Sequence, residues 1–262
     1  MATSACIFCG GKPVTNEHLF PKWMTAVIKS HPRAGNAPVN FSHLMGTTTI
    51  QGTKTRRWEA SGMDTKTRCV CKPCNEGWMG NIEDNARPYL TSMITSGKRV
   101  TLTKDIRQKI ATWAALKAMI AKTLGHPVSP ASKHWRDWMY KEHSAPPEWN
   151  VWLASYVGRV SSFYECADVR SPLAPGDNPF AGVVFDMLIG YLQIKVFGAD
   201  GVPGELRPGL ALRIWPKRPT AVVWPPPGGF ADDLIGWYWG FWKPDVSGIV
   251  TAYPDIVKGP PW

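Results

Sequence analysis

The sequence has no long hydrophobic run. Its longest candidate, residues 183–196, is short and is interrupted by Asp186, Gln193 and Lys195. A helix that crosses a membrane needs about 20 predominantly apolar residues, and the mean hydropathy of the chain is -0.20. We therefore expect no membrane-spanning segment and no membrane partner.

A secretory signal is also lacking. The first residues, MATSACIFCGG, contain no basic segment followed by an apolar stretch. Disulfide frameworks belong to oxidising compartments, so we expect a cytoplasmic protein whose six cysteines do not form such a framework. The sequence further lacks an internal repeat, a Walker-type phosphate loop and a dinucleotide-binding fingerprint.

Acidic residues are the minority among the charged side chains. The 262 residues include 20 Asp and Glu against 30 Lys and Arg, which gives a formal net charge of +10. Such an excess favours a polyanionic partner such as nucleic acid. Because 44% of the residues are hydrophobic and only 19% are charged, the composition predicts a folded chain.

The cysteines are concentrated in two C-x-x-C pairs. A two-residue gap in a tight turn lets both thiolates point at one ion, and two such turns complete a tetrahedral site for structural Zn²⁺. Of the other two cysteines, Cys69 is the alternative to Cys71 as a ligand, and Cys166 is expected to be a small buried residue. The predicted zinc ligands are Cys6, Cys9, Cys71 and Cys74.

Two segments beside these pairs contain residues suited to catalysis. Glu17-His18-Leu19-Phe20-Pro21 follows the first pair, and Asn75 directly follows the second. An imidazole titrates near neutrality and can deprotonate a water molecule at physiological pH. A neighbouring carboxylate can hold a hard cation such as Mg²⁺ against a phosphate. These residue types together suit the hydrolysis of a phosphodiester.

The order C-x-x-C, Glu-His-x-x-Pro, C-x-x-C-Asn resembles the HNH endonucleases of the zinc-containing ββα-metal type, over about the first 90 residues. The resemblance implies a zinc-clamped hairpin and helix, with a separate Mg²⁺ or Mn²⁺ ion for cleavage. It makes His18 the general base, Glu17 a ligand of the catalytic ion, and Asn75 a second ligand or the residue that orients His18. The family often has an Asn several residues before the second cysteine pair; residues 62–68 contain none, and Asp64 is a substitute.

Each of these residues also has a purely structural interpretation. His18 could cap the strand or bond to a backbone carbonyl, and Glu17 could be a solvated surface carboxylate. Asn75 precedes an expected helix, where asparagine is a favoured N-cap. On that helix we expect Glu83 and Asp84 to lie on the exposed face.

Basic residues gather between the cysteine pairs, with Trp58 among them. Lysine and arginine on strands beside the catalytic turn would contact phosphates and make binding salt-dependent. The alternative is a solvated hairpin. The predicted nucleic-acid-binding residues are Lys54, Arg56, Arg57, Lys66, Arg68 and Lys72.

The second half of the chain begins with helical patterns. Apolar residues recur at helical spacing over residues 103–124, where Thr103 is a suitable N-cap. A shorter helix is expected over residues 132–141. Its predicted apolar side consists of Trp135, Trp138 and Met139.

Later segments are rich in β-forming residues and are separated by proline and glycine. For residues 183–197 a helical first half is the alternative. The aromatic segment 235–242 is expected to be buried, with a stacking platform or an interface for an oligomer or protein partner as alternatives. The expected strand regions are 149–160, 183–197, 210–215 and 221–224.

These patterns predict an α+β protein. A zinc-clamped ββα-metal (HNH-like) module, residues 1–95, is followed by helices and a mixed or β-rich C-terminal region, residues 96–262. The leading hypothesis is a metal-dependent endonuclease, a hydrolase that acts on DNA, with RNA as the alternative substrate. The competing hypothesis is a catalytically inactive zinc module that binds nucleic acid or a protein partner.

Overall fold

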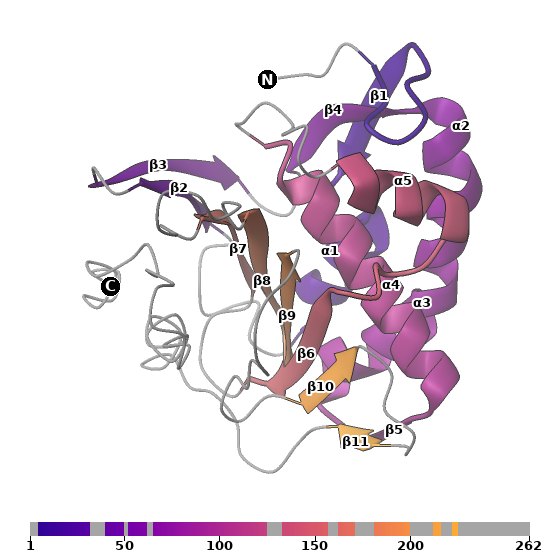
Figure 1. The fold of residues 1–262 in the computed structure, drawn as a ribbon. Coiled ribbons are helices and arrows are strands. Elements are labelled where there is room, and N and C mark those ends of the chain that lie inside the picture. Colours follow the sequence, from indigo (N-terminus) through magenta and orange to yellow (C-terminus); the bar gives the residue numbers. More distant parts are fainter. Residues whose placement is uncertain are drawn as a thin grey trace.

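The computed structural model has a mixed α+β fold (Figure 1). It describes residues 5–31, 40–49, 52–61, 65–124, 133–156, 162–170, 181–199, 212–215 and 222–224. The elements of the first half are β1 (Val14–His18), α1 (Lys22–Lys29), β2 (Asn40–Thr49), β3 (Gly52–Ser61), β4 (Lys66–Cys71), α2 (Lys72–Cys74), the π-helical turn η1 (Asn75–Met79) and α3 (Gly80–Ser96). Those of the second half are β5 (Val100–Leu102), α4 (Lys104–Ala121), α5 (Lys133–Glu142), β6 (Asn150–Ser155), β7 (Ser162–Arg170), β8 (Ala181–Ile189), β9 (Leu192–Ala199), β10 (Leu212–Trp215) and β11 (Val222–Trp224).

The first and fourth strands form a small antiparallel sheet that leads into a helix. His18 on β1 lies opposite Lys66 on β4, and Glu17 lies opposite Thr67. After β4 the chain turns helical through α2, η1 and α3, with non-helical backbone angles at Gly77. A helical segment thus follows directly on the antiparallel pair of β1 and β4, and α1, β2 and β3 lie between these two strands in the sequence.

A seven-stranded sheet makes up the other side of the molecule, and the helices gather along one of its faces (Figure 1). Its strand order is β10-β6-β9-β8-β7-β2-β3. Helix α4 packs on β6, β8, β9 and β10 and also on α3. Every residue from Ile110 to Ala121 is buried, as expected for a helix enclosed on all sides.

One hydrophobic core runs through both halves of the chain. It contains buried residues from Cys6 to Trp215. The boundary expected near residue 95 falls at the end of α3, and residues on both sides of it contribute to this core. The packing consequently links the cysteine-rich region to α4 and the large sheet.

The helical predictions for the second half are largely confirmed. Thr103 caps α4, because its Oγ1 accepts a hydrogen bond from the backbone N–H of Ile106 at 3.3 Å. In α5, Trp135 and Met139 are buried as expected. Trp138 is a correction: it is 40% exposed, and its indole N–H reaches the Ser144 hydroxyl at 3.3 Å instead of the core.

The region 183–197 consists of two strands, so the helical alternative for its first half is wrong. Alternate residues of β8, Val183, Phe185 and Met187, belong to the core, which is the period of a strand. Strand β7, which pairs with β8, was not among the predicted strands. The aromatic segment 235–242 lies outside the described residues. Among the helices of the described part, none has the length and apolar character needed to cross a membrane.

The turn between β8 and β9 allows a first test of the packing. Gly190 adopts a φ of +58°, and a Cβ built there would lie 2.4 Å from the Ile94 carbonyl oxygen. Strain and overpacking each cost about 1–3 kcal/mol, so Gly190→Ala should lower the free energy of unfolding by that amount, measured by urea denaturation. Gly80→Ala is the control: Gly80 is helical and its Cβ would meet only an ordinary 3.5 Å contact, so it should lose no stability. Equal stability of the two variants would contradict the packing seen here.

Candidate functional site

The two cysteine pairs come together at one end of the small sheet. The Sγ atoms of Cys6, Cys9, Cys71 and Cys74 all lie within 4.8 Å of one another. Cys9 Sγ is 3.4 Å from Cys71 Sγ and 3.5 Å from Cys74 Sγ. Four thiolates around zinc, with bonds of about 2.3 Å, have sulfur separations near 3.8 Å. The four cysteines could therefore hold a metal ion such as zinc.

The backbone next to the first cysteine pair lies close against the clustered thiols. The Gly11 N–H points at Cys9 Sγ, 3.4 Å away. A Cβ at Gly11 would lie 3.2 Å from that sulfur and 3.5 Å from Cys71 Sγ. A side chain at this position would crowd both thiols, so the loop approaches the cluster through a residue that has none.

The remaining cysteines are separate from this cluster. Cys69 is fully buried, and burial raises the pKa of its thiol to about 12. The sulfur of Cys71, and not that of Cys69, lies with those of Cys6, Cys9 and Cys74, so Cys71 is the fourth member of the cluster, as the spacing predicted. Cys166 is buried, which confirms its expected role as a small core residue.

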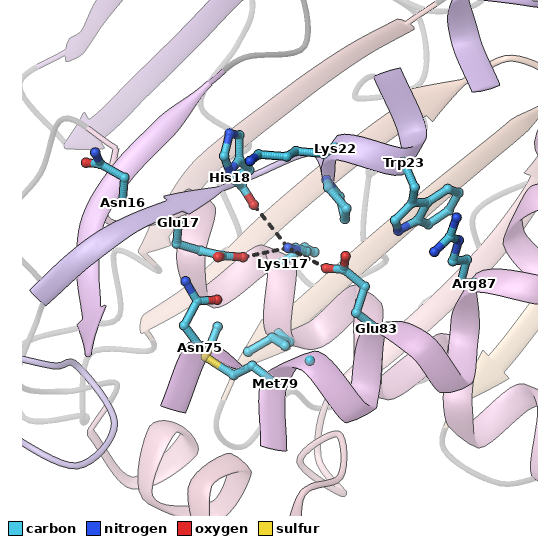
Figure 2. A pocket seen from close by; sticks show the side chains of 13 residues that line it. Asn16, Glu17, His18, Lys22, Trp23, Asn75, Met79, Glu83, Arg87 and Lys117 are labelled. Atoms are coloured by element: carbon cyan, nitrogen blue, oxygen red, sulfur yellow. Dashed lines mark hydrogen bonds and ion pairs between the residues drawn. The ribbon is translucent and has the colours of Figure 1, made fainter. Parts of the chain in front are cut away.

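A pocket lies beside the small sheet, between β1 and the helices (Figure 2). Its volume is about 440 Å³. Strand β1, the start of α1, the helix that follows the second cysteine pair, and α4 all contribute side chains to it. The lining residues are Asn16, Glu17, His18, Pro21, Lys22, Trp23, Asn75, Met79, Gly80, Glu83, Arg87, Leu116 and Lys117.

Glu17 lies in this pocket and is paired with a lysine. Its Oε1 accepts a hydrogen bond from Lys117 Nζ at 2.8 Å, and Glu17 is only 7% exposed. The interpretation of Glu17 as a solvated surface carboxylate is therefore wrong. Its role as a metal ligand remains a prediction.

Glu83 also belongs to the pocket, which corrects the expectation that it lies on the exposed face of its helix. Its Oε2 is 3.4 Å from Lys117 Nζ. Burial raises the pKa of Glu83, and the attraction of Lys117 offsets only part of this effect. Asp84, the next residue, is exposed as expected.

Lys117 is enclosed by these groups. Its side chain is 1% exposed, and its Nζ also donates to the His18 carbonyl oxygen at 3.0 Å. Burial acts to lower the pKa of Lys117, but Glu17 and Glu83 outweigh it and raise the pKa above its ordinary value. Lys117 is therefore a charged ammonium between two carboxylates.

His18 is half-buried at the end of β1. Its backbone carbonyl points at Lys117, while its imidazole lies on the other side of the strand, beside the Lys22 side chain (Figure 2). The ring is therefore separated from the buried ion pairs, although His18 is one of the residues that line the pocket.

Asn75 points toward Glu17 from the helix below (Figure 2). Its Nδ2 lies 3.5 Å from the Thr15 hydroxyl, which itself donates to the Val70 carbonyl oxygen. The N-cap interpretation is wrong, because the helix begins at Lys72 and Asn75 has helical backbone angles. Its side chain is thus directed at the pocket and caps no helix.

The predicted basic residues divide into two groups. Lys66, Arg68 and Lys72 are exposed on β4 and α2, and Lys66 lies opposite His18. The backbone of Lys54, Arg56 and Arg57 lies in the hairpin strand β3, whereas their side chains, and the substitute ligand Asp64, lie outside the described part of the chain.

Sequence reasoning missed Glu83 and Lys117 as members of the site. Asn75, Met79 and Glu83 are four residues apart and so lie on one side of a helix, which is a signal that the sequence contained. Lys117 is the single charged residue of the stretch 110–121. A lone charge in an apolar helix was a second signal in the sequence.

Comparison with known proteins does not assign this chain to a family. No protein-family model matches the chain, and neither a curated protein nor a solved structure matches it.

Proposed function

We propose that this protein is a metal-dependent endonuclease of the HNH type, acting on DNA in preference to RNA. The observation that carries the proposal is the meeting of Glu17, His18 and Asn75 at one pocket, next to a cluster of four cysteines. Two of these residues come from the first strand and one from the helix that follows the second cysteine pair. Their order along the chain is that of the family the sequence resembles.

In this proposal His18 is the general base. His18 is a lining residue of the pocket, and its imidazole would take a proton from the attacking water. Glu17 and Asn75 supply the oxygen atoms that Mg²⁺ or Mn²⁺ prefers, and the ion, when bound, would stabilise the charge that develops on the phosphate.

Basic side chains around the pocket suit a phosphodiester substrate. Lys22 and Arg87 are exposed lining residues of the pocket, and Arg87 lies over the Trp23 ring at 5.5 Å. Lys66 is exposed on the neighbouring strand, opposite His18. These cations would contact the phosphates on either side of the cleaved bond, so binding should weaken as salt rises.

The proposal is tested by Glu17→Gln. Glutamine keeps an oxygen for Lys117 but removes the charge that would hold a divalent ion, so cleavage of DNA with Mg²⁺ or Mn²⁺ should fall by at least about 100-fold. Wild-type cleavage should also stop when the catalytic ion is withheld and the zinc content is unchanged. Glu76→Gln is the matched control, since Glu76 is exposed and pairs with Lys72, at 3.7 Å. Full activity of Glu17→Gln would count against the proposal.

The second candidate is a zinc module that binds nucleic acid without cutting it. The buried ammonium of Lys117 favours it, because a cation already satisfies Glu17. It predicts salt-dependent binding of DNA or RNA by the wild type and no cleavage with any divalent ion. Cleavage that Glu17→Gln abolishes would exclude it.

A further inference from the structure

The contacts of Lys117 form a small cage of oxygen atoms. The Nζ atom lies 2.8 Å from Glu17 Oε1 and 3.0 Å from the His18 carbonyl oxygen. The third oxygen, Glu83 Oε2, is 3.4 Å away. An ammonium has three N–H donors, and three oxygen atoms surround this one.

Carboxylate and backbone carbonyl oxygens are also the ligands that hard divalent cations take in proteins. We propose that Glu17, Glu83 and the His18 carbonyl form a cation cage that the ammonium of Lys117 fills, and that Lys117 is thereby the positioning residue of Glu17. Figure 2 shows the three contacts converging on Lys117 from β1 and α3. The ammonium plays the structural part that a metal ion plays in other carboxylate sites.

The charges of the cage support this assignment. Two carboxylates contribute −2 and Lys117 contributes +1, so one negative charge remains. Holding a buried carboxylate, Glu17, beside a partly buried one, Glu83, without a cation is unfavourable, and Lys117 is the residue whose charge lies between them. Without that charge, the cage would attract a cation from solution.

The cage also determines which carboxylate oxygen of Glu17 can bind the catalytic ion. This consequence rests on the proposed nuclease function. The ion pair uses Oε1 of Glu17, which leaves Oε2 for an ion on the Asn75 side of the pocket. The wild type would then bind one catalytic ion, in a place distinct from the cage.

The test is the number of Mn²⁺ ions bound by the zinc-loaded chain and by Lys117→Met, measured by electron paramagnetic resonance. Methionine is close to lysine in length and has no charge, so the variant should bind one Mn²⁺ more than the wild type. At a 100-fold excess over its dissociation constant, that ion should raise the melting temperature of the variant by about 5–10 °C more than that of the wild type.

Two further variants separate the cage from general effects. Lys109→Met removes a partly exposed lysine of the same helix, which pairs with Asp105 at 2.7 Å, and it should bind no additional Mn²⁺. The double variant Lys117→Met with Glu83→Gln removes one wall of the cage and should lose the additional ion. Equal Mn²⁺ binding by Lys117→Met and the wild type would overturn the cage.

The wild type allows a measurement that does not depend on the folding of Lys117→Met. A buried ammonium with three acceptors exchanges its protons slowly, so one lysine side-chain signal should be protected in a ¹H–¹⁵N spectrum and should move in Glu83→Gln. If no lysine signal is protected, the cage is wrong. If the wild type binds no Mn²⁺ and Lys117→Met binds one, the cage stands and the catalytic ion of the proposed nuclease does not.

Discussion

Cys74→Ser should release the structural metal and unfold the cysteine-rich end of the protein. Serine is a hard, weakly binding ligand, whereas zinc takes up thiolates readily. The binding free energy of structural zinc in small modules is roughly 10–16 kcal/mol, which is as large as the whole stability of a typical domain. We expect zinc content to fall from one ion per chain to nearly none, measured by a colorimetric zinc assay, with an earlier thermal transition by circular dichroism.

Cys69→Ala is the matched control for this experiment. Cys69 is as buried as Cys74 but lies outside the cluster. Its loss should leave the zinc content at one ion per chain. A Cys74→Ser variant that kept its zinc and its melting temperature would show that the four thiols do not form a metal centre.

Loss of this metal should also change the geometry of the pocket. Cys71 is the last residue of β4, and Cys74 directly precedes the turn that carries Asn75. Phe8, from the loop of the first pair, packs edge-on against Trp78 with ring centroids 5.0 Å apart. The metal would therefore hold the strand of Glu17 and the helix of Asn75 at a fixed separation.

The parts of the fold that the sequence predicted are those set by local chemistry. The four clustered cysteines follow from two C-x-x-C spacings, since that spacing has few uses in a chain without a disulfide framework. The start of α4 follows from Thr103, whose side chain bonds to the N–H of Ile106 three residues later. Both predictions depend on residues close together in the sequence.

The parts that could not be predicted depend on residues far apart. Glu17 and Lys117 are 100 residues apart in the chain, so no spacing rule joins them. The strand β2 pairs in parallel with β7, at Thr47 and Asp168, which no local pattern indicates. The β1 residues and Asn75 of the pocket were consequently expected at the site, and its α4 wall was not.

His18→Ala should abolish nearly all cleavage if His18 is the general base. General base catalysis by a positioned side chain contributes about 10²–10⁴-fold, so kcat should fall by that factor while KM changes little. The cage should survive, because Lys117 bonds to the backbone carbonyl of His18 and not to its ring. Zinc content and melting temperature should therefore match the wild type.

Adding free imidazole to His18→Ala tests whether the lost ring itself takes the proton. Alanine leaves the space of the lost ring empty, so added imidazole should restore part of the activity of His18→Ala, in proportion to its unprotonated fraction, and should not accelerate the wild type. His134→Ala is the matched control, because that imidazole is half exposed on α5 and lies outside the pocket. A His18→Ala variant with full activity would mean that another group activates the water. A loss of activity that imidazole does not restore, together with a lowered melting temperature, would mean that His18 supports the strand and takes no part in proton transfer.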